Sequence, residues 1–553
     1  MDSSFNIMLQ KSLKDNWYLS ALSDYKGITL TYSDVARRIE KLHIVYEICG
    51  VKKGDKIALC SKNQANWGVV LLSALTYGAV AVPILHEFKP GNIHHIVNHS
   101  DSRILFVGDV IWEQLNEAEM PGLDAVINIS DFTILYETDP IVSETREHLN
   151  ELFGKKYPKN FRPEHLKFHK DTAEELSMIN YTSGTTGFSK GVMIPYRALL
   201  SNIEFGKQVH PHLNNQSNVV AMLPTAHMYG MMFEFLFEIS VGAHIHFLTR
   251  VPSPKIIMDA FAEIKPDIVI SVPLIIEKIY KKKLQPIINK TSMKVLLSLP
   301  VVDLKVQRKI KEALITTFGG KFKEIIIGGA AFNMEAEAFF RKIGFPFTVG
   351  YGMTECAPII TYAPWDNTRL HSCGKAVVNM EVKIDSEDPQ NIPGQILCRG
   401  KNVMLGYYKN KKATDLVIDS QGWLQTGDIG VMDSDGYIYI KGRSKSMILG
   451  PSGQNIYPEE IESAINNMPY VIESLVIEEK GQLVALIYPD FEQVQNEEVS
   501  ESELEQKMEE LRFTINEELP NYCKIQAVKI FPEEFEKTPK RSIKRFLYQR
   551  SEL

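Results

Sequence analysis

The stretch YTSGTTGFSKGV, from Tyr181 to Val192, constrains the fold of this chain more than any other part of the sequence. After Tyr181 it contains five Ser or Thr residues and three glycines, a composition that cannot fill an apolar core. It follows an apolar segment, residues 176–179, and precedes a helix that we expect from Pro195. This order predicts a strand, a loop that binds phosphate, and a helix.

Glycines in this loop let backbone N–H groups approach an anion, because glycine has no Cβ to obstruct the contact. Hydroxyl groups add hydrogen-bond donors, and a lysine adds positive charge. The candidate phosphate-binding residues are Thr182, Ser183, Gly184, Thr185, Thr186, Gly187 and Lys190. The Walker A pattern needs glycine immediately before the lysine and Ser or Thr after it, whereas this chain has Ser189 and Gly191. We therefore predict a phosphate loop of another kind. A glycine-rich loop alone is also compatible with a connection that binds nothing.

Length and composition limit the classes of function. With 553 residues the chain exceeds one ordinary core, so we expect two or more domains, one of them large. The formal net charge of −7 argues against a general nucleic-acid binder. Six cysteines without CxxC spacing argue against a disulfide framework and a zinc ribbon, and they favour a reducing, cytoplasmic compartment. No signal peptide is evident at the N-terminus.

The nineteen residues from Trp67 to Leu85 carry no formal charge and have the length of a membrane span. Gly78 and Pro83 interrupt them, however. We therefore expect a buried helix from Trp67 to about Tyr77, followed by a buried strand from Ala79 to Ile84.

Helix and strand patterns alternate over residues 28–110 and again over residues 219–271. The first region is expected to contain the helix Tyr32–Cys49, the strand Lys56–Cys60, the helix Ile93–His99 and the strand Ile104–Val107. Such alternation predicts an α/β domain with parallel-rich sheets covered by helices.

Two groups of polar residues in this part of the chain have more than one interpretation. His94, His95 and His99 allow a metal site, because His95 and His99 are four residues apart, about one helical turn. No Cys or carboxylate cluster completes such a site, so surface or capping histidines are preferred. The basic run from Lys278 to Lys283 is expected on a helix. It is interpreted as a solvated face, with a site for a membrane or for coenzyme A phosphates as the alternative.

Around Gly442 the character of the sequence changes. We expect a helix from Pro458, strands Leu475–Ile477 and Leu483–Tyr488, and a helix over Glu503–Glu518. The predicted organisation is a large N-terminal domain, residues 1–444, and a small α+β C-terminal domain, residues 445–553.

Further segments place chemically useful residues directly after predicted strands. Pro224–Gly230 puts His227 at a strand end, where ligands usually bind in such sheets, although a structural histidine is the alternative. Ile327–Ala331 offers Gly329 and Ala330, where a flat ligand can lie against the backbone. Either an acyl pocket or core packing is predicted for Met228, Met231, Met232, Phe233 and Phe235.

These motifs resemble those of the adenylate-forming superfamily, which includes acyl-CoA synthetases, luciferases and nonribosomal adenylation domains. Residues 181–192 match its pattern Y-T-S-G-T-T-G-x-P-K-G-V except at Ser189, and GYGMTE at 350–355 and TGD at 426–428 also have counterparts. The resemblance implies that Tyr351 stacks on adenine, Thr354 contacts phosphate and Glu355 holds magnesium. Magnesium indeed prefers one or two carboxylates together with substrate phosphates.

The resemblance assigns four more roles. It implies that Asp428 accepts the ribose hydroxyls with help from Arg443, and that His227 lies beside the carboxylate being activated. Lys445 falls at the hinge that lets the C-terminal domain move, and Lys190 joins His227, Thr354 and Glu355 as a catalytic candidate.

Within the superfamily the chain looks most like a long-chain fatty acid–CoA ligase, because residues 369–375 and 400–408 resemble that branch. The implied reaction uses ATP, Mg²⁺ and coenzyme A to convert a fatty acid into an acyl-adenylate and then a thioester. Alternatives are a carrier-protein acceptor, another carboxylic acid, or a protein that binds acyl groups or nucleotides without turnover. No nucleic-acid partner and no transmembrane segment are expected. Peripheral membrane contact, acyl length and oligomeric state stay open.

The C-terminal tail departs from the family. The pattern Thr-Pro-x-x-Lys-(Ile/Leu)-x-Arg aligns on Thr538, Pro539, Ile543 and Arg545, and it puts Ser542 where the family has a lysine that contacts substrate oxygens during adenylation. A short neutral hydroxyl cannot replace that charge. Either adenylation is impaired, or Lys540 or Lys544 serves instead. The basic residues of the tail are also compatible with a solvated face.

Overall fold

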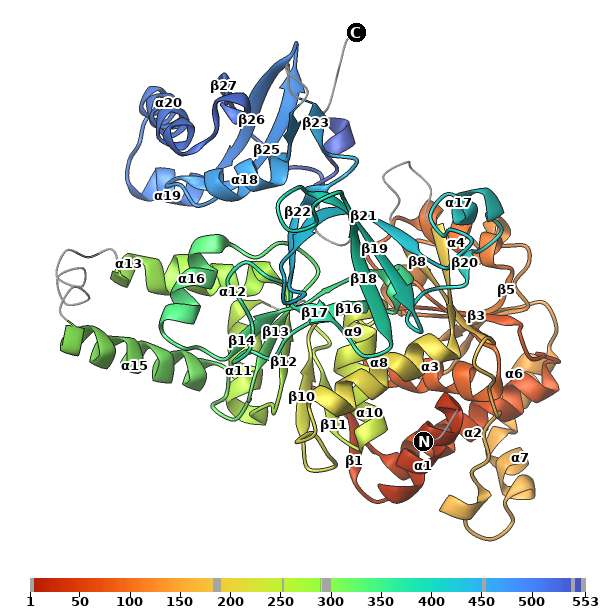
Figure 1. The fold of residues 1–553 in the computed structure, drawn as a ribbon. Helices are drawn as coiled ribbons and strands as arrows, with labels where there is room; N and C mark the ends of the chain where they lie inside the picture. The colour runs from red at the N-terminus through yellow and green to blue at the C-terminus, as the bar shows by residue number, and fades with distance from the viewer. Residues whose placement is uncertain are drawn as a thin grey trace.

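The computed structural model describes residues 4–182, 190–250, 253–288, 290, 300–449, 454–538 and 543–548. A large N-terminal part contains several sheets with helices packed on them, and a smaller C-terminal part lies at one end, next to β22 (Figure 1). The main buried apolar cluster extends from Phe5 to Ile438, and a separate cluster extends from Ile448 to Ile525. The chain thus passes from one apolar cluster to the other between Ile438 and Ile448.

The central eight-stranded sheet has parallel strands in its middle and antiparallel strands at its edges. In spatial order its strands are β20 (Gly406–Tyr407), β9 (Lys190–Pro195), β8 (Leu176–Thr182), β4 (Val80–Pro83), β3 (Lys56–Cys60), β5 (Ser102–Val107), β6 (Ala125–Asn128) and β7 (Ile134–Glu137). The helix expected from Pro195 is confirmed, because a helix begins at Tyr196 with Pro195 as its N-cap. The strand between the phosphate loop and this helix was not predicted. Residues 190–195 pair antiparallel with β8, and α8 (Tyr196–Val209) follows. Their apolar side chains are buried against the sheet, where the hairpin satisfies the backbone N–H and C=O groups.

Two smaller parallel-rich sheets complete the α/β architecture. One has the order β10 (Asn218–Ala221), β11 (His244–Phe247), β1 (Ser20–Asp24), β2 (Thr29–Thr31), and the other β12 (Val269–Ser271), β13 (Ile325–Ile327), β14 (Phe347–Val349). Helix α3 (Ala65–Tyr77) contacts β1 of one sheet and β3 and β4 of another. All of its residues except Tyr77 are buried, and the predicted buried helix followed by a strand is confirmed. Among the described residues, no helix has the length and apolar character needed to cross a membrane.

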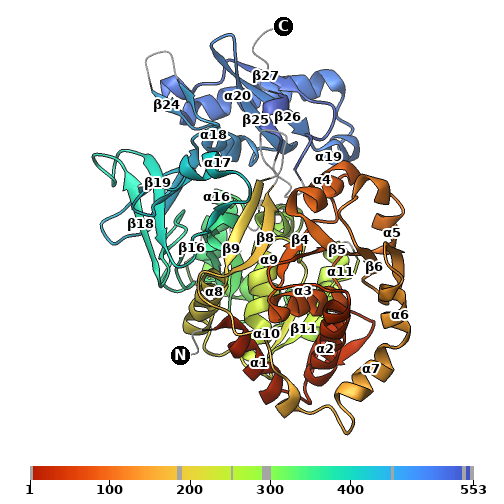
Figure 2. The same ribbon diagram turned by 90° about the vertical axis from the view of Figure 1, so that its right-hand side faces the viewer.

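Helices surround these sheets (Figure 2). Their bounds are α1 (Phe5–Asp15), α2 (Tyr32–Ile48), α4 (Pro90–Ser100), α6 (Ile141–Glu147), α7 (Leu149–Lys156), α10 (Phe237–Val241), α11 (Pro254–Ile264), α12 (Pro273–Ile279), α15 (Pro300–Thr317) and α16 (Met334–Lys342). Of the three histidines on α4, His94 is buried and contacts Glu119, so a surface role is wrong for it. His99 makes a hydrogen bond of 2.7 Å between Nδ1 and the hydroxyl of Tyr181. In the described part of the chain, no group of three or more His, Cys, Asp or Glu side chains is arranged to hold a metal ion.

Antiparallel sheets lead from the N-terminal part to the C-terminal part. Their strands are β15 (Tyr351–Gly352), β16 (Ile359–Tyr362), β17 (Lys375–Ala376), β18 (Met380–Asp385), β19 (Gly394–Gly400), β21 (Leu424–Met432) and β22 (Ile438–Arg443). The C-terminal part contains β23 (Ile448–Leu449), β24 (Asn455–Ile456), α18 (Pro458–Ile465), β25 (Val471–Glu479), β26 (Gln482–Pro489), α19 (Phe491–Asn496), α20 (Glu501–Glu518) and β27 (Ala527–Ile530). It is an α+β unit as predicted, with β27 as an additional strand parallel to β26.

Candidate active site

Loops at the ends of several strands converge on one cavity of about 2280 Å³. Every predicted site residue that the structure describes lines it: Thr182, Lys190, His227, Gly329, Ala330, Tyr351, Thr354, Glu355, Asp428, Arg443, Lys445 and Lys544. Ser183, Gly184, Thr185, Thr186, Gly187, Lys540 and Ser542 lie outside the described residues. Segments that are more than 300 residues apart in the chain are thus brought to a single site.

Glu355 lies on the short 3-10 turn η5 (Thr354–Cys356) and is 9% exposed. The hydroxyl of Tyr407, on β20, donates to its Oε1 at 2.9 Å. The backbone is fixed as well, because Met404 N donates to the Glu355 carbonyl at 2.8 Å. Lys190 Nζ lies 4.7 Å from the centre of the Tyr407 ring. Sequence reasoning did not single out Tyr407, which holds the carboxylate in place from a strand about fifty residues away in sequence. A fixed carboxylate at the cavity wall is compatible with a magnesium ion that is also bound to substrate phosphates.

Asp428 is buried and has a partner on each carboxylate oxygen. The hydroxyl of Tyr351 donates to Oδ2 at 2.6 Å, and Nε of Arg443 lies 2.9 Å from Oδ1. Asp428 and Arg443 are brought together because they face each other in the register of β21 and β22. Burial raises the pKa of Asp428, while Arg443 and Tyr351 oppose this rise. The carboxylate is therefore held at a fixed position in the wall of the cavity.

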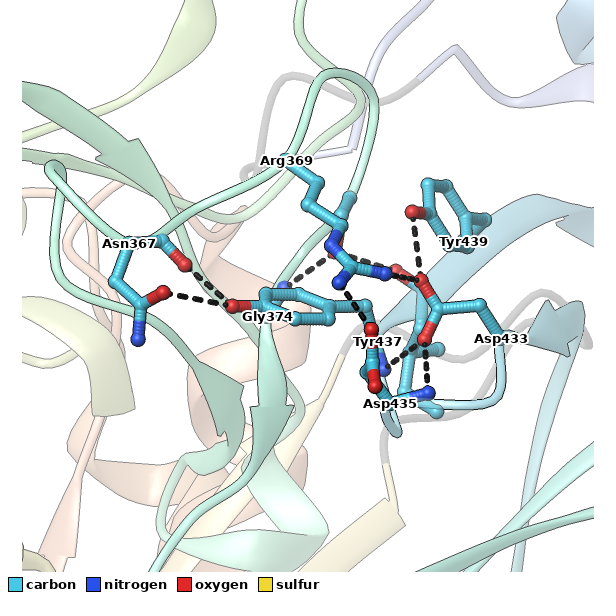
Figure 3. A network of polar contacts seen from close by, with 9 residues as sticks. Asn367, Arg369, Gly374, Asp433, Asp435, Tyr437 and Tyr439 are labelled. Atoms are coloured by element: carbon cyan, nitrogen blue, oxygen red, sulfur yellow. Dashed lines mark hydrogen bonds and ion pairs between the residues drawn. The ribbon is translucent and has the colours of Figure 1, made fainter.

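The turn between β21 and β22 is held by a polar network (Figure 3). Arg369 forms ion pairs with Asp433 and Asp435, and its guanidinium lies 4.3 Å from the ring centre of Tyr437. Tyr439 donates to Asp433 at 3.0 Å. Planar guanidinium groups suit both contacts. Because β21 carries Asp428 and β22 carries Arg443, this network fixes the hairpin that presents both residues.

Three buried polar side chains support the loop that carries His227. Asn63 donates to the Leu223 carbonyl at 2.7 Å and accepts from both the N–H and the hydroxyl of Thr225 at 3.0 Å. Asn180 donates to the Ala226 carbonyl at 3.0 Å. The carboxylate of Glu234, on the π-helix η3 (Met231–Leu236), accepts from Met222 N and Leu223 N at 3.2 and 2.9 Å. Sequence reasoning missed all three supports. Asn63 lies in a segment without a motif, and Asn180 and Glu234 lie beside motif or cluster residues without belonging to the pattern.

We expect Asn63→Ala to lower the free energy of unfolding by about 1–3 kcal/mol, because buried groups of Leu223 and Thr225 lose their hydrogen-bond partner. Turnover should fall as well, since His227 lies two residues after Thr225. Urea unfolding and steady-state turnover measure the two effects. Thr225→Val removes only the hydroxyl bond and should lose less in both assays. Equal losses in the two variants would contradict the role given to Asn63.

The apolar residues after His227 divide between the cavity and the core. Met228 and Phe233 line the cavity, whereas Met231, Met232 and Phe235 are buried among core residues and do not line it. Tyr229 lies across the cavity wall and donates to the Ile326 carbonyl at 3.1 Å. A Cβ at Gly328 would come within 3.0 Å of the Tyr229 ring, so glycine permits this close approach. Core packing is thus confirmed for Met231, Met232 and Phe235, whereas Met228 and Phe233 stay candidates for an acyl pocket.

The C-terminal part contributes residues to the same cavity. Lys544 forms an ion pair with Glu536, and Arg545 Nη2 lies 2.7 Å from Glu462. Lys281, from the basic run, donates to the Asn466 carbonyl at the end of α18 at 2.5 Å. A solvated face is therefore wrong for Lys281, which contacts the C-terminal part, and burial lowers its pKa.

Comparison with known proteins agrees with these observations. Residues 12–408 match the AMP-binding enzyme family, and residues 445–550 match the AMP-binding enzyme C-terminal domain. The chain belongs to the AMP-binding enzyme family. This confirms the superfamily predicted from the motifs, and the second match begins at the predicted hinge residue.

Among sequence relatives of this AMP-binding enzyme, a long-chain-fatty-acid–CoA ligase of Escherichia coli O6:H1 is 29% identical over 453 residues. The alignment covers 77% of this chain and 74% of that protein. Long-chain-fatty-acid–CoA ligase ACSBG1 of Rattus norvegicus is 26% identical over 516 residues, covering 86% and 67%.

Solved structures support the fold of this AMP-binding enzyme. Anthranilate CoA ligase AuaEII in complex with anthranoyl-AMP has a TM-score of 0.79 at 20% identity, with 99% of this chain and 96% of that chain covered. ATP-bound MatB from Rhodopseudomonas palustris has a TM-score of 0.76 at 21% identity, covering 99% and 98%. These likenesses confirm the α/β fold class.

Proposed function

We propose that this protein is an AMP-forming fatty acid–CoA ligase. The observation that carries the proposal is the shared cavity. The apolar Met228 and Phe233 line the same cavity as the carboxylates Glu355 and Asp428. An activating enzyme needs such proximity, because the acyl carboxylate must meet the α-phosphate of ATP. The names of the relatives, long-chain-fatty-acid–CoA ligases, favour a fatty acid over other carboxylic acids.

In the proposed first step, a carboxylate oxygen attacks the α-phosphate of ATP, and pyrophosphate leaves. Magnesium, held at Glu355, would neutralise phosphate charge. Lys190 supplies a second positive charge from its position over the Tyr407 ring. Asp428 holds the ribose, Tyr351 lies against the base, and His227 lies beside the carboxylate. In the second step the thiol of coenzyme A attacks the acyl carbon, and AMP leaves.

The test is formation of AMP from ATP and a fatty acid, measured with and without coenzyme A. We expect AMP and acyl-CoA in equal amounts only when all three substrates are present. A requirement for a carrier protein in place of free coenzyme A would favour the carrier-protein alternative. Absence of pyrophosphate release with any carboxylic acid would favour a protein that binds without turnover.

We further propose that the chain works in the cytoplasm and that its two domains, residues 1–444 and 445–553, move about Lys445. All six cysteines are free thiols, as a reducing compartment favours. The hinge proposal is supported by the separation of the apolar cores on either side of this residue. Lys445 is exposed in a turn just after β22, where a change in φ and ψ disturbs no core packing.

We expect Lys445→Pro to preserve ATP–pyrophosphate exchange and to abolish most thioester formation, because proline fixes φ and restricts the rotation that a hinge needs. Single-turnover assays of the two half-reactions separate these effects. Lys445→Ala keeps the backbone free and should support both half-reactions. Normal thioester formation by the proline variant would show that the hinge lies elsewhere.

A further inference from the structure

One histidine side chain lies among aromatic residues of the cavity wall. His210 follows α8 directly and lines the cavity together with Phe205, Phe237 and Tyr362. The ring centre of His210 lies 6.0 Å from that of Tyr362 and 6.5 Å from that of Phe237. The backbone explains only its position: His210 N donates to the Gly206 carbonyl at 2.9 Å and ends the helix. An aromatic or aliphatic side chain would fill this place as well.

The imidazole of His210 is 4% exposed, and its Nε2 has no hydrogen-bond partner among the described residues. Its Nδ1 lies 4.0 Å from Oε2 of Glu324, beyond hydrogen-bond distance. Burial lowers the pKa of His210 to about 3, so the ring is neutral and offers one donor and one acceptor nitrogen. A buried polar group without a partner costs free energy, which a bound ligand can recover by hydrogen bonding to it.

Glu324 does not use His210 as its partner. The hydroxyl of Tyr362 and the N–H of Trp365 donate to its two carboxylate oxygens at 2.5 and 2.6 Å. Burial raises the pKa of Glu324 to about 7, so the carboxyl carries partial negative charge at neutral pH. A second anionic group beside His210 would be repelled by Glu324 and would also lose its hydration. The chemistry around His210 therefore favours a neutral oxygen.

We propose that His210 forms a hydrogen-bonding subsite of the acyl cavity and that the protein prefers fatty acids carrying a hydroxyl group at the matching depth of the chain. A hydroxyl can donate and accept, so it pairs with either neutral tautomer of the imidazole. This inference rests on the proposed function, because it assigns the substrate class of the same cavity. A dicarboxylic acid, whose second carboxylate would meet Glu324, should be a poor substrate.

The test compares kcat/KM for coenzyme A-dependent AMP formation across hydroxy fatty acids of one chain length, with the hydroxyl at successive positions, and the unsubstituted acid. All of these acids have the acyl length that the wild-type protein converts fastest. We expect one position, or two adjacent positions, to exceed the unsubstituted acid by about tenfold or more, because a subsite built for a hydroxyl discriminates against its absence. The corresponding dicarboxylic acid should fall below the unsubstituted acid.

In His210→Phe the ratio of kcat/KM for the preferred hydroxy acid to kcat/KM for the unsubstituted acid should fall to about one. His212→Phe changes a neighbouring histidine that does not line the cavity, and this variant should keep the preference. His210→Gln retains a polar side chain and should keep part of the preference for the hydroxy acid. This variant provides the test if His210→Phe does not fold. Thermal unfolding monitors folding of each variant.

Turnover of the unsubstituted acid without preference for any hydroxyl position overturns the subsite, and so does a preference that survives in His210→Phe. Neither result affects the proposed function. Absence of coenzyme A-dependent AMP formation with every acid would instead refute the proposed function, and the subsite with it. The two failures are thus distinguishable.

Discussion

The Glu355→Gln variant is expected to lose ATP–pyrophosphate exchange by about a hundredfold or more. The substitution keeps the size of the side chain and an oxygen to accept the hydrogen bond from Tyr407, but it removes the negative charge that would hold magnesium. Loss of one preorganised electrostatic group in an active site typically costs two to three powers of ten in rate, on the order of 10²–10³. Exchange measured at saturating ATP and magnesium reports this loss directly.

Two controls separate loss of the charge from loss of the fold. Tyr407→Phe removes the hydrogen bond to Oε1 and keeps the carboxylate, so we expect a much smaller loss of exchange. Thermal unfolding of Glu355→Gln should stay close to that of the wild type, because the site loop lies at the cavity wall. Wild-type exchange in Glu355→Gln would remove Glu355 from the proposed metal site.

The periodic elements of the large domain could be predicted from the sequence because their burial is regular. The strand Lys56–Cys60 and the helix beginning at Tyr32 were placed correctly, since one is a short apolar run and the other starts at the capping residue Thr31. The strand at 190–195 was not foreseen. Apolar residues immediately after a glycine-rich loop are compatible with a helix or a strand, and only pairing with β8 decides between them.

The candidate site also contains residues that could be predicted from the sequence and residues that could not. Residues within motifs could be found from sequence because the motifs are recognisable locally, wherever they lie in the fold. Lys190 begins β9 and His227 follows β10 of a different sheet, whereas Asp428 lies within β21 of a third sheet.

The supports of the site residues could not be found, because they come from elsewhere in the chain. Asn63 and Thr225 are 162 positions apart, and Tyr407 and Glu355 are 52 apart. Contacts of this kind depend on the packing of whole elements, which no local pattern encodes.

The described basic residues on either side of position 542 all have acidic partners. Lys544 lines the cavity but is paired with Glu536, and Arg545 is bound to Glu462 and to the Val476 carbonyl. Lys537 lies 2.7 Å from Glu473. These pairs fix the tail within the C-terminal part. Position 542 itself lies outside the described residues, so the case for a lysine there rests on the family pattern.

We expect Ser542→Lys to raise the rate of adenylate formation by about tenfold or more, because an added ammonium group can stabilise charge that develops on the substrate oxygens in the transition state. Affinity for ATP should change little, since that interaction strengthens only as the reaction proceeds. Single-turnover adenylation and ATP titration measure the two quantities separately. Lys544→Ala should leave adenylation nearly unchanged, because this lysine is already paired with Glu536. Lys540→Ala tests the other lysine that could replace the missing family lysine. A large loss confined to one alanine variant, together with no gain in Ser542→Lys, would identify that lysine as the substitute and show that the chain is not impaired by its serine.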